Sequence, residues 1–284
     1  MFDCAIIGTG PAGLSAALNL KLHNKSFVWF GSKTMSDKVR RSEQIANYPG
    51  AALVSGEELH SSFVRQAQQM DLTITDKMVS QIMAGKDGYT LLADNEIFDA
   101  RTIIFATGVV TSRTIPGEEA LLGRGVSYCA TCDGFLYRDK TIGVVCYASR
   151  FEHEIQYLAQ LAQKVYLFPY YKDCGVSGDN ICVLRQKIER IQGEQRLTSL
   201  TLGDGTQLPL DGLFCMRDAI APSTLLHGIG MEAGQIVVDR TMATNLAGCF
   251  AAGDCTGGPY QIAKAVGEGN VAAHSVIAYL AAAQ

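Results

Sequence analysis

The order of apolar and polar residues at the start of the chain is strand, turn, helix, strand. A short apolar run at residues 3–7 predicts a buried strand, and the Ala- and Leu-rich run at residues 14–20 predicts a helix. A second apolar run at residues 26–30 stands where the next parallel strand of a βαβ unit belongs. The opening of the chain is therefore predicted to fold as one βαβ unit.

A stretch in the middle of the chain repeats this order. Residues 141–145 predict a buried strand, residues 151–162 a helix and residues 164–168 another strand. The repetition indicates two related α/β domains, one inserted in the other. Further apolar runs predict strands at residues 100–106 and 249–252 and a terminal helix at residues 262–280.

Composition narrows the class of protein. The 284 residues are 48% apolar and 18% charged, which fits one large or two ordinary globular domains and excludes a disordered chain. A net charge of −4 argues against nonspecific nucleic-acid binding, which needs a concentrated basic surface. The longest uncharged run, residues 4–20, follows Asp3 and contains Gly8, Gly10 and Gly13, so it predicts neither a signal peptide nor a membrane span. Nine cysteines are too few for a disulfide scaffold and odd in number, which favours a reducing cytoplasm.

Glycines follow the first predicted strand in the run Gly8-Thr9-Gly10-Pro11-Ala12-Gly13. In a dinucleotide site the first glycine makes the tight turn, the second lets the backbone approach a pyrophosphate, and the third allows close helix packing. The strand before this run and the helix after it favour such a site over an ordinary glycine-rich turn. The acidic residue that normally holds the adenosine ribose is missing, because Gly31-Ser32-Lys33 follows the second strand; Ser32 offers a hydroxyl instead.

The run Cys129-Ala130-Thr131-Cys132-Asp133 contains the one C-x-x-C of the sequence. No second Cys or His pair stands at a spacing that would complete a tetrahedral zinc site, so we expect no metal. Two thiols three positions apart can close a small disulfide ring and attack an external disulfide, with Asp133 as a candidate proton relay. The alternative interpretation is two unpaired cysteines on a buried turn.

With these motifs the chain resembles the low-molecular-weight thioredoxin reductases over nearly its whole length. The resemblance implies an α/β fold of two Rossmann-like domains, the second inserted in the first. It assigns residues 1–112 and 240–284 to an FAD-binding domain and residues 113–239 to an inserted domain that carries the redox C-x-x-C, and it implies a homodimer. The matching runs, in the family's order, are residues 8–13, Asn47-Tyr48-Pro49-Gly50, Ala106-Thr107-Gly108, Ile115-Pro116-Gly117-Glu118, residues 128–134 and residues 249–254.

The resemblance also implies roles for single residues. Cys132 matches the thiol that faces the flavin, Cys129 the more exposed thiol that attacks the partner disulfide, and Asp133 the proton donor. Asp254 matches a residue bonded to the ribityl chain of FAD and Gln261 a contact to the flavin ring; a solvated turn and a helix cap are the alternatives. The implied FAD contacts are Gly8, Gly10, Pro11, Ala12, Gly13, Ser32, Asn47, Thr107, Gly108, Gly253, Asp254 and Gln261.

The chain departs from the family where the usual reductase binds NADPH. The run Cys146-Tyr147-Ala148-Ser149-Arg150-Phe151 follows the strand of the inserted domain without a glycine, and its larger side chains occupy space that a pyrophosphate needs. The expected arginine cluster is replaced by Phe168-Pro169-Tyr170-Tyr171-Lys172. The chain is similar to the pyridine-nucleotide-independent branch, the ferredoxin-dependent flavin thioredoxin reductases, in its short length, its Phe30-Gly31-Ser32 strand end and the run at residues 254–261.

We therefore expect a cytoplasmic FAD enzyme that reduces the disulfide of thioredoxin with electrons from ferredoxin and has no nucleic-acid or membrane partner. Three alternatives stay open: a diflavin-linked disulfide oxidoreductase with a second FAD, a flavin redox sensor without turnover, and an ordinary NADPH-dependent thioredoxin reductase. Lys33, Lys38, Arg40 and Arg41 form a basic cluster that either receives an acidic ferredoxin or is a solvated loop.

Overall fold

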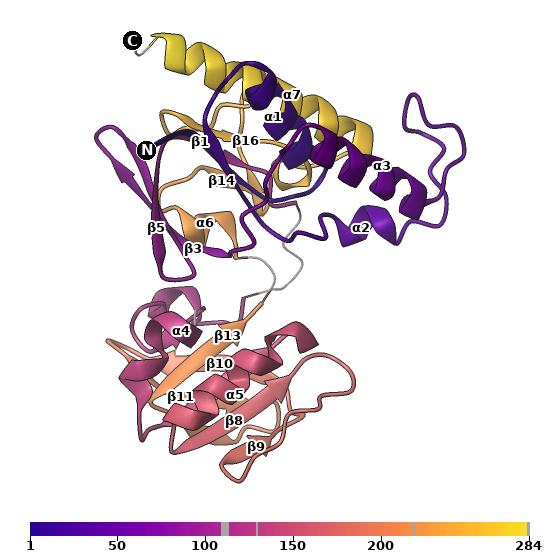
Figure 1. Cartoon of the computed structure of the whole chain (residues 1–284). Coiled ribbons are helices and arrows are strands. Elements are labelled where there is room, and N and C mark those ends of the chain that lie inside the picture. Colours follow the sequence, from indigo (N-terminus) through magenta and orange to yellow (C-terminus); the bar gives the residue numbers. More distant parts are fainter. Residues whose placement is uncertain (109–113, 129, 218–219, 283–284) are drawn as a thin grey trace. The chain divides into compact units, whose positions relative to one another are not determined.

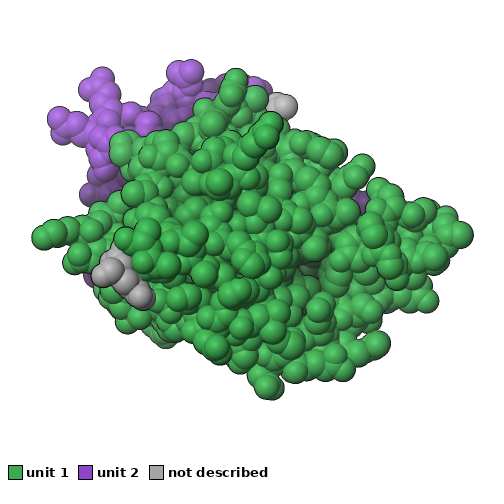
Figure 2. All heavy atoms as spheres, turned by 90° about the horizontal axis from the view of Figure 1, so that it is seen from above, with its two compact units in different colours: residues 1–110, 221–284 green, residues 111–220 purple. Residues whose placement is uncertain are grey.

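The computed structural model describes the chain except residues 109–113, 129, 218–219 and 283–284, and of residues 119, 131 and 132 it describes the backbone alone. The chain divides into two compact units: unit 1 contains Met1–Val110 and Ala221–Gln284, and unit 2 contains Thr111–Ile220. Figure 1 labels the elements, and Figure 2 colours unit 1 green and unit 2 purple. Each unit has its own main sheet and its own hydrophobic core.

Unit 1 combines a mostly parallel sheet with helices from both ends of the chain. Its strands are β1 (Phe2–Ile7), β2 (Phe27–Phe30), β3 (Val79–Gly85), β4 (Gly88–Ala93), β5 (Glu96–Phe105), β14 (Met231–Glu232), β15 (Gln235–Ile236) and β16 (Cys249–Ala251). Its helices are α1 (Pro11–Leu22), α2 (Asp37–Arg40), α3 (Gly56–Gln69), α6 (Pro222–Leu225) and α7 (Ile262–Ala282). The sheet order is β2-β1-β5-β4-β3, and β16 also pairs with β5.

The centre of this sheet explains the continuous apolar run at the start of the chain. β1 lies between β2 and β5 and runs parallel to both, so both of its edges are hydrogen-bonded within the sheet. Cys4, Ala5 and Ile6 point alternately to the two faces and are all fully buried, so both faces are covered as well, which favours a continuous apolar run. β3 and β4 form an antiparallel hairpin that pairs with the first half of β5, while β16 runs parallel to the second half. The predicted βαβ opening is therefore present, followed by a hairpin that the sequence analysis did not anticipate.

Helices α1 and α7 lie side by side, although they come from opposite ends of the chain (Figure 1). Both helices contribute small, fully buried residues to the same core, among them Ala16, Ala17, Ala272 and Ala273. A Cβ on Gly269 of α7 would lie 2.2 Å from the carbonyl oxygen of Ala12, so the two helices approach more closely than a larger residue allows. The terminal helix thus completes the same layer that the first helix begins.

Unit 2 repeats the α/β plan. Its strands are β6 (Val126–Ser127), β7 (Thr141–Cys146), β8 (Lys164–Pro169), β9 (Ile181–Val183), β10 (Ile188–Gly193), β11 (Leu197–Leu202), β12 (Gln207–Pro209) and β13 (Gly212–Met216); its helices are α4 (Ala130–Asp133) and α5 (Glu152–Leu161). The parallel sheet has the order β6-β13-β7-β8-β9, and β10-β11-β12 form a separate antiparallel sheet. Together the two units confirm the predicted fold class of two Rossmann-like α/β domains.

The second boundary between the units differs from the sequence-based division. Residues 221–239, which the sequence assigned to the inserted domain, group with unit 1. The reason is physical: α6 packs against β3, and Leu226 forms an isolated parallel bridge with Ile82 of β3. Within the described part of the chain, none of the helices has the length and apolar character needed to cross a membrane.

Candidate functional site

Four parallel strands of unit 1 end in register at one edge of the sheet. Ile7 of β1 pairs with Phe30 of β2 and with Phe105 of β5, and Phe105 pairs with Ala251 of β16. In doubly wound α/β folds the carboxyl edge of the parallel strands is where cofactors bind. The runs that continue from these four strand ends are residues 8–13, Gly31-Ser32, Ala106-Thr107-Gly108 and Ala252-Gly253-Asp254.

The three motif glycines meet three different spatial demands. Gly8 has φ +120°, and a Cβ there would lie 2.1 Å from the carbonyl oxygen of Ala106. A Cβ on Gly13 would lie 1.9 Å from the carbonyl oxygen of Gly8, so the helix packs directly on the turn. A Cβ on Gly10 would meet nothing within 4 Å. Gly8 and Gly13 are thus required by the turn itself. Gly10 instead borders open space, where a ligand can come close to the protein backbone.

Helix α1 begins at this turn with its N-terminus available to an anion. Gly10 is the N-cap and supplies no side-chain cap, Pro11 occupies the first turn, and Ala12 is buried behind them. The N–H groups of the first turn have no partner within the helix, so they suit the oxygens of a pyrophosphate. The Thr107 hydroxyl, at the end of β5, is buried and has no hydrogen-bond partner among the described residues. Gly108 follows with φ +67°. These features fit an FAD pyrophosphate.

The end of β2 forms a small hydroxyl-rich turn. Thr9 of the glycine motif donates to the carbonyl oxygen of Ser32 at 3.1 Å, and the Ser32 hydroxyl lies 2.7 Å from that of Thr34. Ser32 therefore stands at the same edge as the glycine motif. Asn47 lies farther along the chain, exposed in the loop between two isolated bridges, and no described contact ties it to the strand ends.

Asp254 follows β16 and lies in a short 3-10 turn, residues Asp254–Thr256. Its carboxylate, whose side chain is 14% exposed, pairs with Lys38 Nζ at 2.5 Å, and the Lys38 ammonium lies 5.7 Å from the ring centroid of Tyr260. Gln261 is exposed and its carbonyl accepts the N–H of Ala265, so it stands directly before α7. Lys38 thus pairs with Asp254, a candidate FAD contact, whereas Arg40 and Arg41 of the same basic cluster pair with Asp37.

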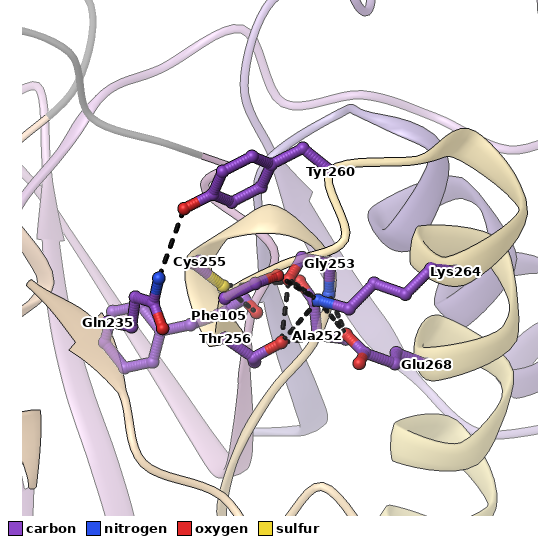
Figure 3. A network of polar contacts seen from close by, with 10 residues as sticks. Phe105, Gln235, Ala252, Gly253, Cys255, Thr256, Tyr260, Lys264 and Glu268 are labelled. Carbon is purple, nitrogen blue, oxygen red and sulfur yellow. Dashed lines mark hydrogen bonds and ion pairs between the residues drawn. The ribbon is translucent and has the colours of Figure 1, made fainter. Parts of the chain in front are cut away.

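Two residues of α7 that the sequence analysis did not single out also hold this loop. Lys264 and Glu268 reach from the first turns of α7 to the backbone on either side of Asp254 (Figure 3). Their spacing of four residues on a predicted helix was a visible signal, since oppositely charged side chains so placed lie on one face.

The predicted dithiol falls at the start of unit 2. Cys129 lies outside the described residues, and the backbone of Cys132 lies in the single turn of α4. Asp133 ends that turn half-buried, and Gly134 follows against α5, where a Cβ would approach Leu158 and Tyr157 to 3.1 and 3.2 Å. α4 therefore carries Cys132 and Asp133 on a turn packed against the helix of the second βαβ unit.

At the carboxyl edge of the unit 2 sheet an ion pair is buried. Arg217 Nη2 lies 2.8 Å from Glu118 Oε1, and the two side chains are 2% and 0% exposed. The Tyr128 hydroxyl donates to Glu118 Oε1 at 2.8 Å, and the Ile115 N–H donates to Oε2 at 2.8 Å. Burial by itself would lower the pKa of Arg217, but the neighbouring Glu118 raises that pKa, so the guanidinium stays charged. Tyr147 covers the pair, with its ring centroid 4.8 Å from the guanidinium.

Comparison with known proteins gives relatives over the whole chain. Residues 2–149 and 179–269 match the pyridine nucleotide-disulphide oxidoreductase family. The thioredoxin reductase of Helicobacter pylori strain J99 is 34% identical, and the match covers 99% of each chain. A crystal structure of a ferredoxin-flavin thioredoxin reductase from Clostridium acetobutylicum is 40% identical with a TM-score of 0.91, covering 99% of this chain and 98% of that one. A thioredoxin reductase structure from Gloeobacter violaceus is 28% identical with a TM-score of 0.79, covering 99% and 94%.

Proposed function

The chain belongs to the pyridine nucleotide-disulphide oxidoreductases, and within them to the FAD-binding thioredoxin reductases, and from this premise we propose that it reduces thioredoxin with electrons from ferredoxin. The disulfide-reducing activity and the flavin follow from family membership. The identity of the electron donor is the new part of the proposal. It is argued from the turn after β7 in unit 2, where the usual reductase has its second glycine motif.

The observation that carries the proposal is that the turn after β7 lacks the glycines of a dinucleotide motif. Cys146, Ala148 and Phe151 stand at the spacing of the three motif glycines of unit 1, and none of them is glycine. Phe151 is buried in the core of unit 2. A 3-10 turn, Ser149–Phe151, precedes α5, which begins only at Glu152, whereas α1 begins directly after its second glycine. The helix N-terminus that would receive a pyrophosphate is thus set back along the chain.

The neighbouring side chains add to this argument. Tyr147 directly follows β7, its ring packs edge-on against Tyr170 at 5.3 Å, and it lies over Arg217. Arg217, at the end of β13, is committed to Glu118. Glu118 neutralises the Arg217 guanidinium, so this cation is not offered to a nucleotide phosphate, and the Tyr147 ring lies over it. This favours a donor other than a nicotinamide nucleotide.

Ferredoxin is the donor that the chemistry and the relatives support. FAD, when bound, accepts electrons singly and passes two on to a disulfide, so it suits a one-electron iron-sulfur donor. The Clostridium acetobutylicum protein is by name a ferredoxin-flavin thioredoxin reductase, and it is 40% identical over nearly the whole chain. We extend the proposal to a homodimer, on the family resemblance, and to a cytoplasmic location, on the number of cysteines.

In the proposed exchange, Cys129 and Cys132 act as the dithiol. The Cys129 thiolate attacks one sulfur of the thioredoxin disulfide, which forms a mixed disulfide and releases the other sulfur as a thiolate that takes up a proton. The Cys132 thiolate then attacks the Cys129 sulfur, closes the ring disulfide and releases thioredoxin as a dithiol. Asp133, next in the chain, is assigned the proton transfers. One disulfide is reduced and one is formed, so the electrons balance.

An anaerobic mixing experiment tests both parts. The purified yellow protein is mixed separately with NADPH, NADH and reduced ferredoxin, and flavin absorbance and thioredoxin thiols are followed. We expect reduced ferredoxin to bleach the flavin and generate thioredoxin thiols, and neither nucleotide to do so. Cys129→Ser and Cys132→Ser should retain FAD and its bleaching but lose thioredoxin reduction. Rapid bleaching by NADPH would overturn the donor assignment, and a flavin-to-protein ratio near two would favour the diflavin alternative.

A further inference from the structure

We infer that Lys264 and Glu268 are positioning residues for FAD, acting through the loop of residues 253–257, here named the flavin loop. The inference rests on the proposed role of Asp254, which lies within this loop, as a contact to the ribityl chain. Neither α7 side chain is assigned to touch the cofactor. Their part is to fix the backbone that presents Asp254 to it.

Lys264 closes the flavin loop from one side. Its Nζ donates to the carbonyl oxygen of Gly253 at 2.8 Å, to that of Gly257 at 2.6 Å and to the Thr256 hydroxyl at 2.9 Å (Figure 3). The two glycines have φ +88° and +109° and flank the 3-10 turn that carries Asp254. An ammonium group has three donors, and all three are used on this one loop.

Glu268, one helical turn after Lys264, holds the same loop. Its Oε2 accepts the Gly253 N–H at 2.8 Å and the Thr256 hydroxyl at 2.9 Å, and it lies 3.0 Å from Lys264 Nζ. Both polar groups of the Gly253 peptide backbone are therefore held by α7. The Lys264 and Glu268 side chains are 15% and 20% exposed, so the pair is largely shielded from water and more effective than an exposed helix pair.

The flavin loop also contacts the glycine motif that opens the chain. A Cβ on Gly253 would lie 2.9 Å from the Cβ of Ala12, in the first turn of α1. The loop is thus confined between α1, whose N-terminus suits the pyrophosphate, and α7, which supplies Lys264 and Glu268. A fixed loop backbone sets the position of Asp254 relative to the pyrophosphate site. A long dinucleotide needs such a fixed position, because it is bound at several points along its length.

The test compares FAD binding and stability in four variants of the full chain. Lys264→Met removes the ammonium that holds the flavin loop, and Glu268→Gln removes the charge of the carboxylate that holds it. Asp254→Asn tests the loop residue itself. Lys77→Met is the matched control, because Lys77 pairs with Glu96 in the same unit but away from the loop. The dissociation constant of FAD for the apoprotein is measured by flavin fluorescence, and the melting temperature is measured with and without excess FAD.

We expect Lys264→Met and Glu268→Gln to weaken FAD binding at least tenfold and to reduce the rise in melting temperature that FAD gives, with little change in the apoprotein. Lys77→Met should leave both measurements unchanged. If both α7 variants bind FAD as tightly as the parent, or lower both melting temperatures equally, the inference fails. If Asp254→Asn binds FAD normally, the assignment of Asp254 fails instead. Glu268→Gln keeps the test open if Lys264→Met does not fold.

Discussion

At the scale of the residue, one Cβ atom decides whether a backbone can receive a phosphate. The space beside Gly10 is open to at least 4 Å, and the helix behind it starts at once. At the corresponding turn of unit 2, Ala148 stands where the second glycine would be, and Phe151 is buried where the third would let the helix approach. Two turns of the same spacing thus have opposite consequences for a dinucleotide.

Buried thiols give a prediction at the same scale. Burial raises the pKa of Cys146 and Cys255 to about 11 and that of Cys249 to about 12. Because the thiolate is the reactive form, roughly one in a thousand or fewer of these thiols is ionised at about pH 8. We expect iodoacetamide to leave all three unmodified in the native protein and to label the partly exposed Cys174 and Cys182, as read by peptide mass spectrometry.

Labelling in denaturant is the control, in which all five of these cysteines should react. Native labelling of Cys255 at the rate of Cys182 would contradict the buried thiol. Raising the pH should speed native labelling of the buried cysteines, because their thiolate fraction increases until the pH passes their raised pKa values.

At the scale of the element, the pattern of apolar residues predicted buried strands and helices. The first strand, expected at residues 3–7, occupies Phe2–Ile7, and the helix expected at 151–162 occupies Glu152–Leu161. The β3–β4 hairpin escaped prediction because only one face is buried and exposed residues such as Met83 interrupt its apolar pattern. The strand that begins at Glu96 was expected only from residue 100, because its first half is exposed and gains its order from pairing with β4.

Helix α3 carries an element-scale prediction. Ser55 caps it: its hydroxyl accepts the Glu58 N–H at 3.2 Å, and Glu58 Oε2 accepts the Ser55 N–H at 2.7 Å. We expect Ser55→Ala to lower the free energy of unfolding by about 1 kcal/mol. Ser61→Ala, at an exposed position inside the same helix, is the control and should be neutral or slightly stabilising.

The effect should depend on pH with a defined sign. The backbone and side chain of Ser55 lower the pKa of Glu58, so this stabilisation is present above the unfolded pKa and is lost as the pH falls through the lowered value. Denaturation curves at neutral and at acidic pH should therefore show the difference between parent and Ser55→Ala shrinking in acid. An equal difference at both would contradict a charged capping box.

At the scale of the whole molecule, the sequence predicted the strand-end motifs but not the long-range pairs among them. Lys38 and Asp254 are 216 positions apart, and Arg217 and Glu118 are 99 apart. No local periodicity connects such residues, because only the sheet topology brings them together. Long-range contacts also group residues 221–239 with unit 1: α6 and Leu226 contact β3, and β15 contacts the 3-10 turn at residues 254–256, whereas no break in composition marks this boundary.

The buried pair of unit 2 gives the prediction that separates the two units. Glu118→Gln leaves Arg217 charged in a buried site, which should cost unit 2 about 3–5 kcal/mol, whereas Glu118→Met with Arg217→Met should cost much less. Trp29, the single tryptophan, lies buried in unit 1, so its fluorescence reports that unit, while circular dichroism reports both.

In chemical denaturation of the apoprotein, Glu118→Gln should shift an early dichroism transition to lower denaturant and leave the Trp29 transition in place, because each unit has its own core. Glu194→Gln, exposed in unit 2, is the control and should shift neither. A Trp29 transition that moves with the dichroism would mean that the units unfold together. Separate transitions would mean that the flavin site of unit 1 keeps its stability when unit 2 loses its own, as expected if the nucleotide-type edge of unit 2 can change without cost to FAD binding.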